Sequence, residues 1–130
     1  MKITQEADYA LRIIQYLSET EENHIGAPVI ADTQQVPLRF ALKILRKLNT
    51  AGITKSYRGV SGGYSLSKHP SEISYKQVIE AVDGDIYINK CLRDNDNCTR
   101  KQAETCIIHK KLMKIQLVID EELSNLNFGS

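Results

Sequence analysis

The chain has 130 residues, 42% of them hydrophobic, and a formal net charge of +1 at pH 7. This length is enough for one small domain with its own core and a protruding element. The near-neutral charge excludes a strongly basic overall field, so an argument for a nucleic-acid partner must rest on a local surface. Because no apolar run is as long as a membrane span and the first residues form no apolar signal segment, we expect a cytoplasmic protein without a membrane partner.

Three short amphipathic patterns occupy the first fifty residues. Thr4 is a suitable cap for a helix over residues 5–18, which has apolar residues at three- and four-residue steps. A second helix is expected over residues 29–34, because Pro28 suits a first helical turn. A third helix is expected over residues 38–50, with cationic residues on much of its surface and a buried stripe made by Leu38, Ala41, Leu42, Leu45 and Leu48.

A glycine-rich hairpin should follow, with short β-prone runs on both sides of residues 58–63. Helix, helix-turn-helix and hairpin together are the order of a winged helix. In that fold the third helix enters a DNA major groove, and an arginine of the hairpin reaches phosphates or the minor groove. Exposed lysines on helices are common, so the order of elements is the stronger argument for DNA binding. The residues expected to carry the contact are Arg39, Lys43 and Arg58.

The second half of the chain should contain a short helix, a polar loop and a long final helix. The short helix is expected over residues 75–82, with Ser74 as its cap and Gly84 at its end. The final helix is expected over residues 102–125 and is long for a monomer of this size, which favours a homodimer over packing against its own first domain. Its apolar residues are spaced like a coiled-coil seam, formed by Ile108, Leu112, Ile115, Ile119 and Leu126.

The chain's three cysteines, Cys91, Cys98 and Cys106, share one polar segment. An odd number argues against a closed set of disulfides, and a reducing cytoplasm favours metal or redox use of the thiols. Three thiolates leave one position of a metal site for another ligand. Zinc is the chemical alternative to an iron-sulfur cluster, but structural zinc sites usually use close Cys-x-x-Cys pairs, which this chain lacks.

Together these residues resemble the IscR/NsrR class of dimeric winged-helix transcription regulators, many of which hold an iron-sulfur cluster. The resemblance covers nearly the whole chain and rests on the three cysteines and on residues 1–12, 45–53, 58–64 and 78–84. It implies a repressor without enzymatic activity, in which a homodimer reads a palindromic operator and a cluster senses nitric oxide, redox state or iron-sulfur status. With the positions that the resemblance adds, the DNA-contacting residues are Lys2, Thr4, Arg39, Phe40, Lys43, Arg58 and Ser61.

The fold class expected is therefore a mainly helical winged helix-turn-helix with a small β-hairpin wing and a long C-terminal dimerisation helix. Residues 1–84 would form the DNA-binding domain, residues 85–106 the cysteine-containing cluster loop, and residues 107–130 the dimerisation helix and tail. The cysteine gaps of six and seven residues are longer than is usual in the family, some of whose members have no cluster. The alternatives are a cluster-free repressor controlled by a protein partner or by thiol oxidation, and a zinc-stabilised DNA-binding protein.

The fourth cluster ligand has two candidates, which imply different clusters. His109 is three positions after Cys106, so both side chains can lie on one helix face, and by resemblance histidine ligation implies a [2Fe-2S] cluster. Asp8 matches a carboxylate that nitric-oxide-sensing members supply from the partner subunit, which implies a [4Fe-4S] cluster. The ordinary alternatives are a solvated helix residue for His109 and an intrahelical ion pair with Arg12 for Asp8. The presence of Arg12 one turn after Asp8 favours the carboxylate.

Overall fold

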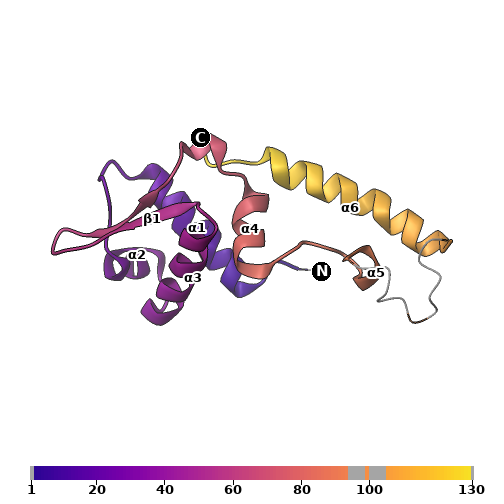
Figure 1. Cartoon of the computed structure of the whole chain (residues 1–130), viewed down its shortest axis with the longest axis horizontal. Helices are drawn as coiled ribbons and strands as arrows, with labels where there is room; N and C mark the ends of the chain where they lie inside the picture. The colour runs from indigo at the N-terminus through magenta and orange to yellow at the C-terminus, as the bar shows by residue number, and fades with distance from the viewer. Residues whose placement is uncertain (1, 94–98, 100–104, 130) are drawn as a thin grey trace.

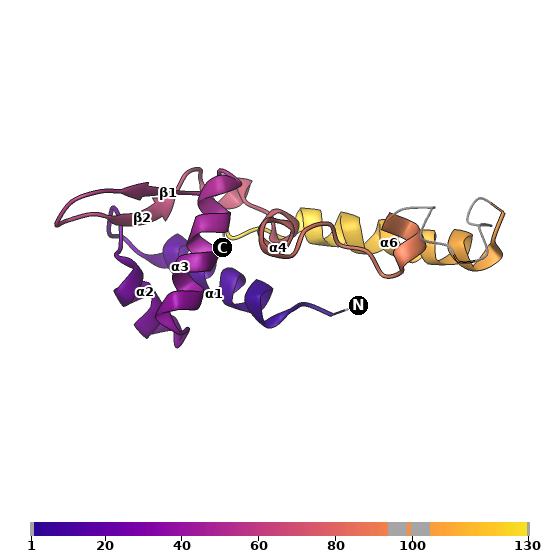
Figure 2. The same ribbon diagram turned by 60° about the horizontal axis from the view of Figure 1, so that its bottom comes forward.

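The computed structural model describes residues 2–93, 99 and 105–129. Helices α1 to α4 and a hairpin form one body, and a long helix extends from it as an arm with a short helix beside it (Figures 1 and 2). This arrangement confirms the expected winged helix-turn-helix with a β-hairpin and a long C-terminal helix. The elements in chain order are α1 (Gln5–Glu19), α2 (Ala27–Gln34), α3 (Leu38–Thr50), β1 (Thr54–Tyr57), β2 (Gly63–Leu66), the 3-10 turn η1 (Pro70–Glu72), α4 (Tyr75–Asp83), α5 (Lys90–Arg93) and α6 (Ile107–Asn125).

Side-chain caps set the starts of two helices. The Thr4 hydroxyl accepts a hydrogen bond from the Ala7 amide at 3.1 Å, so α1 begins where expected. Ser74 and Gln77 form a reciprocal capping box at the start of α4, which ends at Gly84 in a positive-φ conformation. Helix α2 begins two residues earlier than expected, because Pro28 occupies a position in its first turn and Gly26 serves as its cap.

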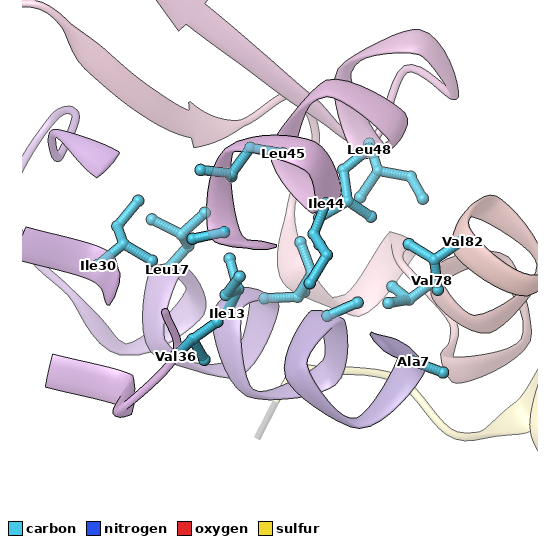
Figure 3. Packing of buried hydrophobic residues seen from close by; sticks show 14 of the residues in the cluster. Ala7, Ile13, Leu17, Ile30, Val36, Ile44, Leu45, Leu48, Val78 and Val82 are labelled. Atoms are coloured by element: carbon cyan, nitrogen blue, oxygen red, sulfur yellow. The ribbon is translucent and has the colours of Figure 1, made fainter. Parts of the chain in front are cut away.

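The core lies between α1, α3 and α4. Ile13 and Leu17 of α1 and the α3 residues Ile44, Leu45 and Leu48 gather in one layer in Figure 3. The expected α3 stripe is wrong at two positions, since Leu38 is 45% exposed and Leu42 40% exposed. At about 100° per residue, these two leucines lie roughly 70° and 110° from the centre of the buried face. The residues that α3 buries are Ala41, Ile44, Leu45 and Leu48.

The hairpin is fixed to the loop that precedes α2. Ile25 pairs with Tyr64 through two backbone hydrogen bonds of 3.0 and 2.8 Å, which adds a short third segment beside β2. This approach requires glycine at position 63, where a Cβ atom would lie 2.5 Å from the Ile25 carbonyl carbon. The His24 ring stacks on Tyr57 with its centroid 4.8 Å away. The wing therefore has a defined direction relative to α1 and α2.

Helix α6 begins at Ile107, because Thr105 is in a turn and Cys106 has extended backbone angles at the N-cap. The expected start at Gln102 lies outside the described residues. Leu126, assigned to the helical seam, follows the helix as its C-cap and is 50% exposed. Beyond it, the Phe128 ring stacks on Tyr75 at 4.6 Å, and this contact returns the tail to α4. In the part of the chain that the structure describes, no helix is long and apolar enough to cross a membrane.

Polar contacts join α6 to the segment that follows α4. Gln116 is the buried polar residue of α6, and its side chain bonds both the carbonyl of Ile86 and the amide of Ile88 at 2.8 Å. It also donates to the Asp120 carboxylate at 3.0 Å. On the facing surface of α4, desolvation raises the pKa of Glu80, nearby Lys76 opposes this shift, and Asp120 contributes to it.

Candidate DNA-binding surface and cysteine site

The first half of α3 presents the expected DNA-contacting residues to solvent. Arg39, Phe40 and Lys43 are all exposed, and the Arg39 guanidinium lies 5.4 Å from the centroid of the Phe40 ring. Farther along the helix Lys47 turns inward, since its ammonium group pairs with Glu6 at 2.8 Å. The exposed cations of α3 are therefore Arg39, Arg46 and Lys43, the last of which lies 4.0 Å from the same Glu6 carboxylate.

The wing carries Arg58 and Ser61 at its exposed tip. The His24 imidazole Nε2 makes a short hydrogen bond with the Ser61 carbonyl, so this contact holds the tip in place. Ser65 donates a hydrogen bond of 3.4 Å to the Tyr57 hydroxyl, and this bond lowers the pKa of Tyr57. His24 was not predicted from the sequence, where its one signal is its place three residues before α2.

The N-terminal residues Lys2 and Thr4 lie on another side of the fold. Besides capping α1, the Thr4 hydroxyl donates a hydrogen bond of 2.7 Å to the Asp83 carboxylate at the end of α4. Lys2 and Thr4 both line a cavity of about 710 Å³ that opens between the N-terminal residues, α4 and α6. Most of its wall is apolar, with contributions from Ile3, Ile79, Ile86, Val118, Ile119 and Leu123.

Two cysteines flank the junction of α5 and α6. Cys91 lies in α5, and Cys106 is the N-cap of α6. His109, in the first turn of α6, brings its Nδ1 within 3.2 Å of the Cys91 sulfur, and both side chains are partly buried. The sequence suggested a shared face for His109 and Cys106, whereas the observed contact joins His109 to the cysteine farthest along the chain from it. Cys98 lies outside the described residues.

Within the part of the chain that the structure describes, neither fourth-ligand candidate stands in a complete metal site. Among residues 2–93, 99 and 105–129, no group of three or more His, Cys, Asp or Glu side chains is arranged to hold a metal ion. Asp8 forms an ion pair of 2.7 Å with Arg12, with side chains 46% and 43% exposed, and Arg12 also lies over the Tyr9 ring. The intrahelical pair considered as the ordinary role of Asp8 is thus present.

Gln116 is a further residue that sequence reasoning missed. Its role could not be predicted, because a single glutamine on an amphipathic helix is usually solvated. Gln116 is buried because the backbone of residues 86–88 approaches α6. Through these bonds the segment leading to Cys91 is attached to the middle of α6. The geometry of the cysteine site therefore depends on a contact made two helical turns away from His109.

Known proteins match this arrangement over the whole chain. The sequence profile of the Rrf2 family, described as an iron-dependent transcriptional regulator, matches residues 3–130. The chain is 28% identical to the regulator IscR of Aliivibrio salmonicida over 99% of its own length and 76% of the relative's. It is 24% identical to NsrR of Shouchella clausii, with 84% and 69% of the two chains covered. CymR of B. subtilis, described as the global cysteine regulator, has a similar structure, with a TM-score of 0.77, 25% identity and coverage of 98% and 93%.

Proposed function

Because the chain belongs to the Rrf2 family of transcriptional regulators, we propose that it is a homodimeric repressor whose affinity for a palindromic operator is controlled by an iron-sulfur cluster. It is a transcriptional regulator and not an enzyme, and the relatives that it matches are also named transcriptional regulators. In this proposal residues 1–84 bind DNA, residues 85–106 carry the cluster loop and residues 107–130 form the dimer contact and tail. The observation that carries the cluster proposal is the contact of 3.2 Å between Cys91 and His109.

The donor atoms at the α5–α6 junction fit such a cluster. Cys91 and His109 offer a soft sulfur and an imidazole nitrogen side by side in a partly buried setting. Cys106, the N-cap of α6, offers a second sulfur at the start of that helix. Cys98 would supply the third sulfur. When bound, the cluster supplies a centre that reacts with nitric oxide or oxygen and can be lost from the protein.

Of the two fourth-ligand candidates, we favour His109. Its nitrogen already lies beside Cys91, whereas the Asp8 carboxylate is engaged by Arg12. The His109→Ala variant should therefore change the visible circular dichroism of anaerobically purified protein, and Asp8→Ala should change it little. Lys110→Ala, an exposed neighbour on the same helix, is the matched control. The opposite pattern would make Asp8 of the partner subunit the fourth ligand, which implies a [4Fe-4S] cluster.

Iron and acid-labile sulfide analysis of anaerobically purified protein tests the cluster itself. We expect both elements together with visible absorbance, which should disappear when Cys91, Cys98 or Cys106 is replaced by Ala. Each cysteine supplies a thiolate that no other residue of the chain can replace, because the sequence has three cysteines in all. Stoichiometric zinc without iron or sulfide, after anaerobic expression with ample iron, would support the zinc alternative and overturn the cluster.

The exposed apolar face of α6 supports a homodimer. Several of its large side chains are more than half exposed, which is costly for an arm that extends from the body, and the apolar cavity lies beside this face. A second copy of the chain would cover both. Sedimentation analysis should show a dimer that Ile115→Lys dissociates and Lys114→Ala does not. A monomeric wild-type protein at micromolar concentration would contradict this part of the proposal. The exposed residues are Ile107, Ile108, Ile115, Leu117 and Val118.

The exposed cations of α3 and the wing support DNA binding. Arg39 and Lys43 are placed for the major groove, and Arg58 for phosphates or the minor groove. Arg58→Ala should weaken operator binding by about 1–3 kcal/mol and leave dimerisation intact, because its side chain is exposed. Fluorescence anisotropy at matched salt concentration measures this effect. Unchanged affinity would remove the wing from the interface.

The similarity to CymR favours a second candidate, a cluster-free regulator that responds to thiol or cysteine status. Cys91 suits this role also, because its partly buried sulfur lies in contact with the imidazole of His109. A protein without iron whose operator affinity changes on mild oxidation, and recovers with dithiothreitol, would establish this alternative. The alternative would be excluded if operator affinity depends on the cluster and if oxidation of the cluster-free protein leaves its operator affinity unchanged.

A further inference from the structure

Helix α3 has two leucines at the border of its buried face that the core does not cover. Leu38 and Leu42 are 45% and 40% exposed and lie one helical turn apart, so they form a short apolar strip. Leu42 is also one turn from Arg39 and from Arg46, both exposed, which places it among the cations of the helix. Helix α3 contains no acidic residue. Its solvent face therefore combines positive charge with an apolar strip along one side.

This combination matches the chemistry of a DNA major groove. The cations suit phosphates and base acceptors, but a leucine has no hydrogen-bonding group and gains free energy only from apolar contact. In the major groove the apolar group on a base edge is the 5-methyl group of thymine. A protein partner would need an apolar patch rimmed by acids, whereas DNA offers both features along one groove. Resting on the proposed DNA binding by α3, we propose that Leu42, assisted by Leu38, contacts thymine methyl groups and thereby selects A·T pairs in each half-site.

Phe40 is a weaker candidate for this role. It is exposed, but its ring is covered on one side by the Arg39 guanidinium at 5.4 Å. It also lies about 160° around the helix from Leu42. When Leu42 faces the groove, Phe40 is therefore turned toward the edge of the interface. The strip of Leu38 and Leu42 combines exposure and apolar character with a place beside the exposed Arg39 and Arg46.

Replacement of thymine by deoxyuridine tests the contact, because it removes the methyl group and leaves the base pairing unchanged. The dimer is first used to select binding duplexes from a randomised library, and each thymine of the selected sequence is then replaced in turn. We expect at least one thymine in each half-site whose replacement weakens wild-type binding about fourfold, the value of one buried methyl group. Leu42→Ala should bind the thymine and deoxyuridine duplexes equally.

Arg46→Ala is the matched control, since its loss should weaken binding to both duplexes and preserve the fourfold methyl dependence. Circular dichroism and sedimentation should show that both variants fold and dimerise, as expected for exposed positions. If the folded dimer selects no duplex at all, the proposed DNA binding fails. If it binds DNA but no deoxyuridine replacement weakens binding, or if Leu42→Ala keeps the full methyl dependence, the leucine contact is overturned and DNA binding stands. The replacement series on wild-type protein needs no variant.

Discussion

Replacing Gln116 by Ala should loosen the segment that carries Cys91. The Gln116 side chain accepts a hydrogen bond from the Ile88 amide and donates one to the Ile86 carbonyl, each at 2.8 Å. Alanine has neither hydrogen-bonding group, so the partly buried Ile86 carbonyl and Ile88 amide both lose this side-chain partner. Because the segment between residues 84 and 90 contains no helix or strand, it has no regular ladder to replace these bonds.

The expected loss is about 2–3 kcal/mol, from two hydrogen bonds at roughly 1–1.5 kcal/mol each. This loss corresponds to about 30- to 150-fold faster hydrogen exchange at the Ile88 amide, if that amide exchanges by local opening. A matched control is Lys114→Ala, which removes an exposed side chain two residues earlier on α6 and outside this network. The Gln116→Glu variant adds a sharper test, because a carboxylate still accepts from Ile88 but cannot donate to the Ile86 carbonyl.

For Gln116→Glu the sign of the pH dependence follows from its surroundings. Burial and the nearby Asp120 should raise the pKa of the introduced carboxyl in the folded protein. The variant should therefore be closest to wild type at acidic pH, below the unfolded pKa, and lose stability as the pH rises through the raised folded value. Exchange measured by mass spectrometry or NMR at several pH values reports both variants. An Ile88 amide that exchanges at the wild-type rate in Gln116→Ala would refute the role assigned to this side chain.

Three further predictions concern the winged-helix body. Leu48→Ala should destabilise it by about 2–5 kcal/mol in denaturant titrations, because Leu48 of α3 is fully buried in the core, and a loss below 1 kcal/mol would contradict that placement. Gly63→Ala should displace the wing and weaken DNA binding more than Gly59→Ser at the tip, since its Cβ would meet the Ile25 carbonyl at 2.5 Å. Because the pKa of Glu80 is raised in the folded protein, the wild type should lose stability as the pH rises through that pKa. Glu80→Gln should reduce this loss, and unfolding free energies that depend on pH in the same way for variant and wild type would refute the assignment.

Local signals predicted most of the element boundaries. Thr4, Ser74 and Gly84 act at helix ends through their own backbone neighbours, so their roles can be inferred from sequence alone. Helix α3 has the expected bounds, and the glycine-rich hairpin pairs Thr54 with Leu66 and Tyr57 with Gly63. These features depend on interactions within a few residues or across one tight turn.

Features set by tertiary contacts were predicted less well. Periodicity placed Leu38 and Leu42 in the core, because an apolar residue at a helical step looks the same whether it meets protein or another partner. The position of Gln116 depends on a backbone segment about thirty residues earlier in the chain. The contact between Cys91 and His109 likewise depends on α5 folding back onto α6, which no spacing rule within the cysteine segment indicates.

The end of α4 contacts both the cap of α1 and helix α3, and the chain leads from there to Cys91. Asp83 accepts a hydrogen bond from Thr4 of the α1 cap at 2.7 Å, and the Val82 carbonyl accepts one from Lys47 of α3 at 3.1 Å. The chain continues directly from this point to the backbone that Gln116 holds and then to Cys91. A change at the cysteine site therefore has a continuous set of contacts to α3.

The strength of these contacts suits a switch. A regulator typically couples two sites by about 1–3 kcal/mol, and the pair of bonds made by Gln116 is of the same size. The loss of these two bonds would be enough to separate the segment of residues 86–88 from α6 without unfolding the core. The cysteine site has two states in this proposal, with and without its cluster. We expect Gln116→Ala to reduce the difference in operator affinity between these two states and to leave the lower of the two affinities unchanged. Equal reduction of both affinities would instead indicate damage to the winged-helix body formed by α1 to α4 and the hairpin.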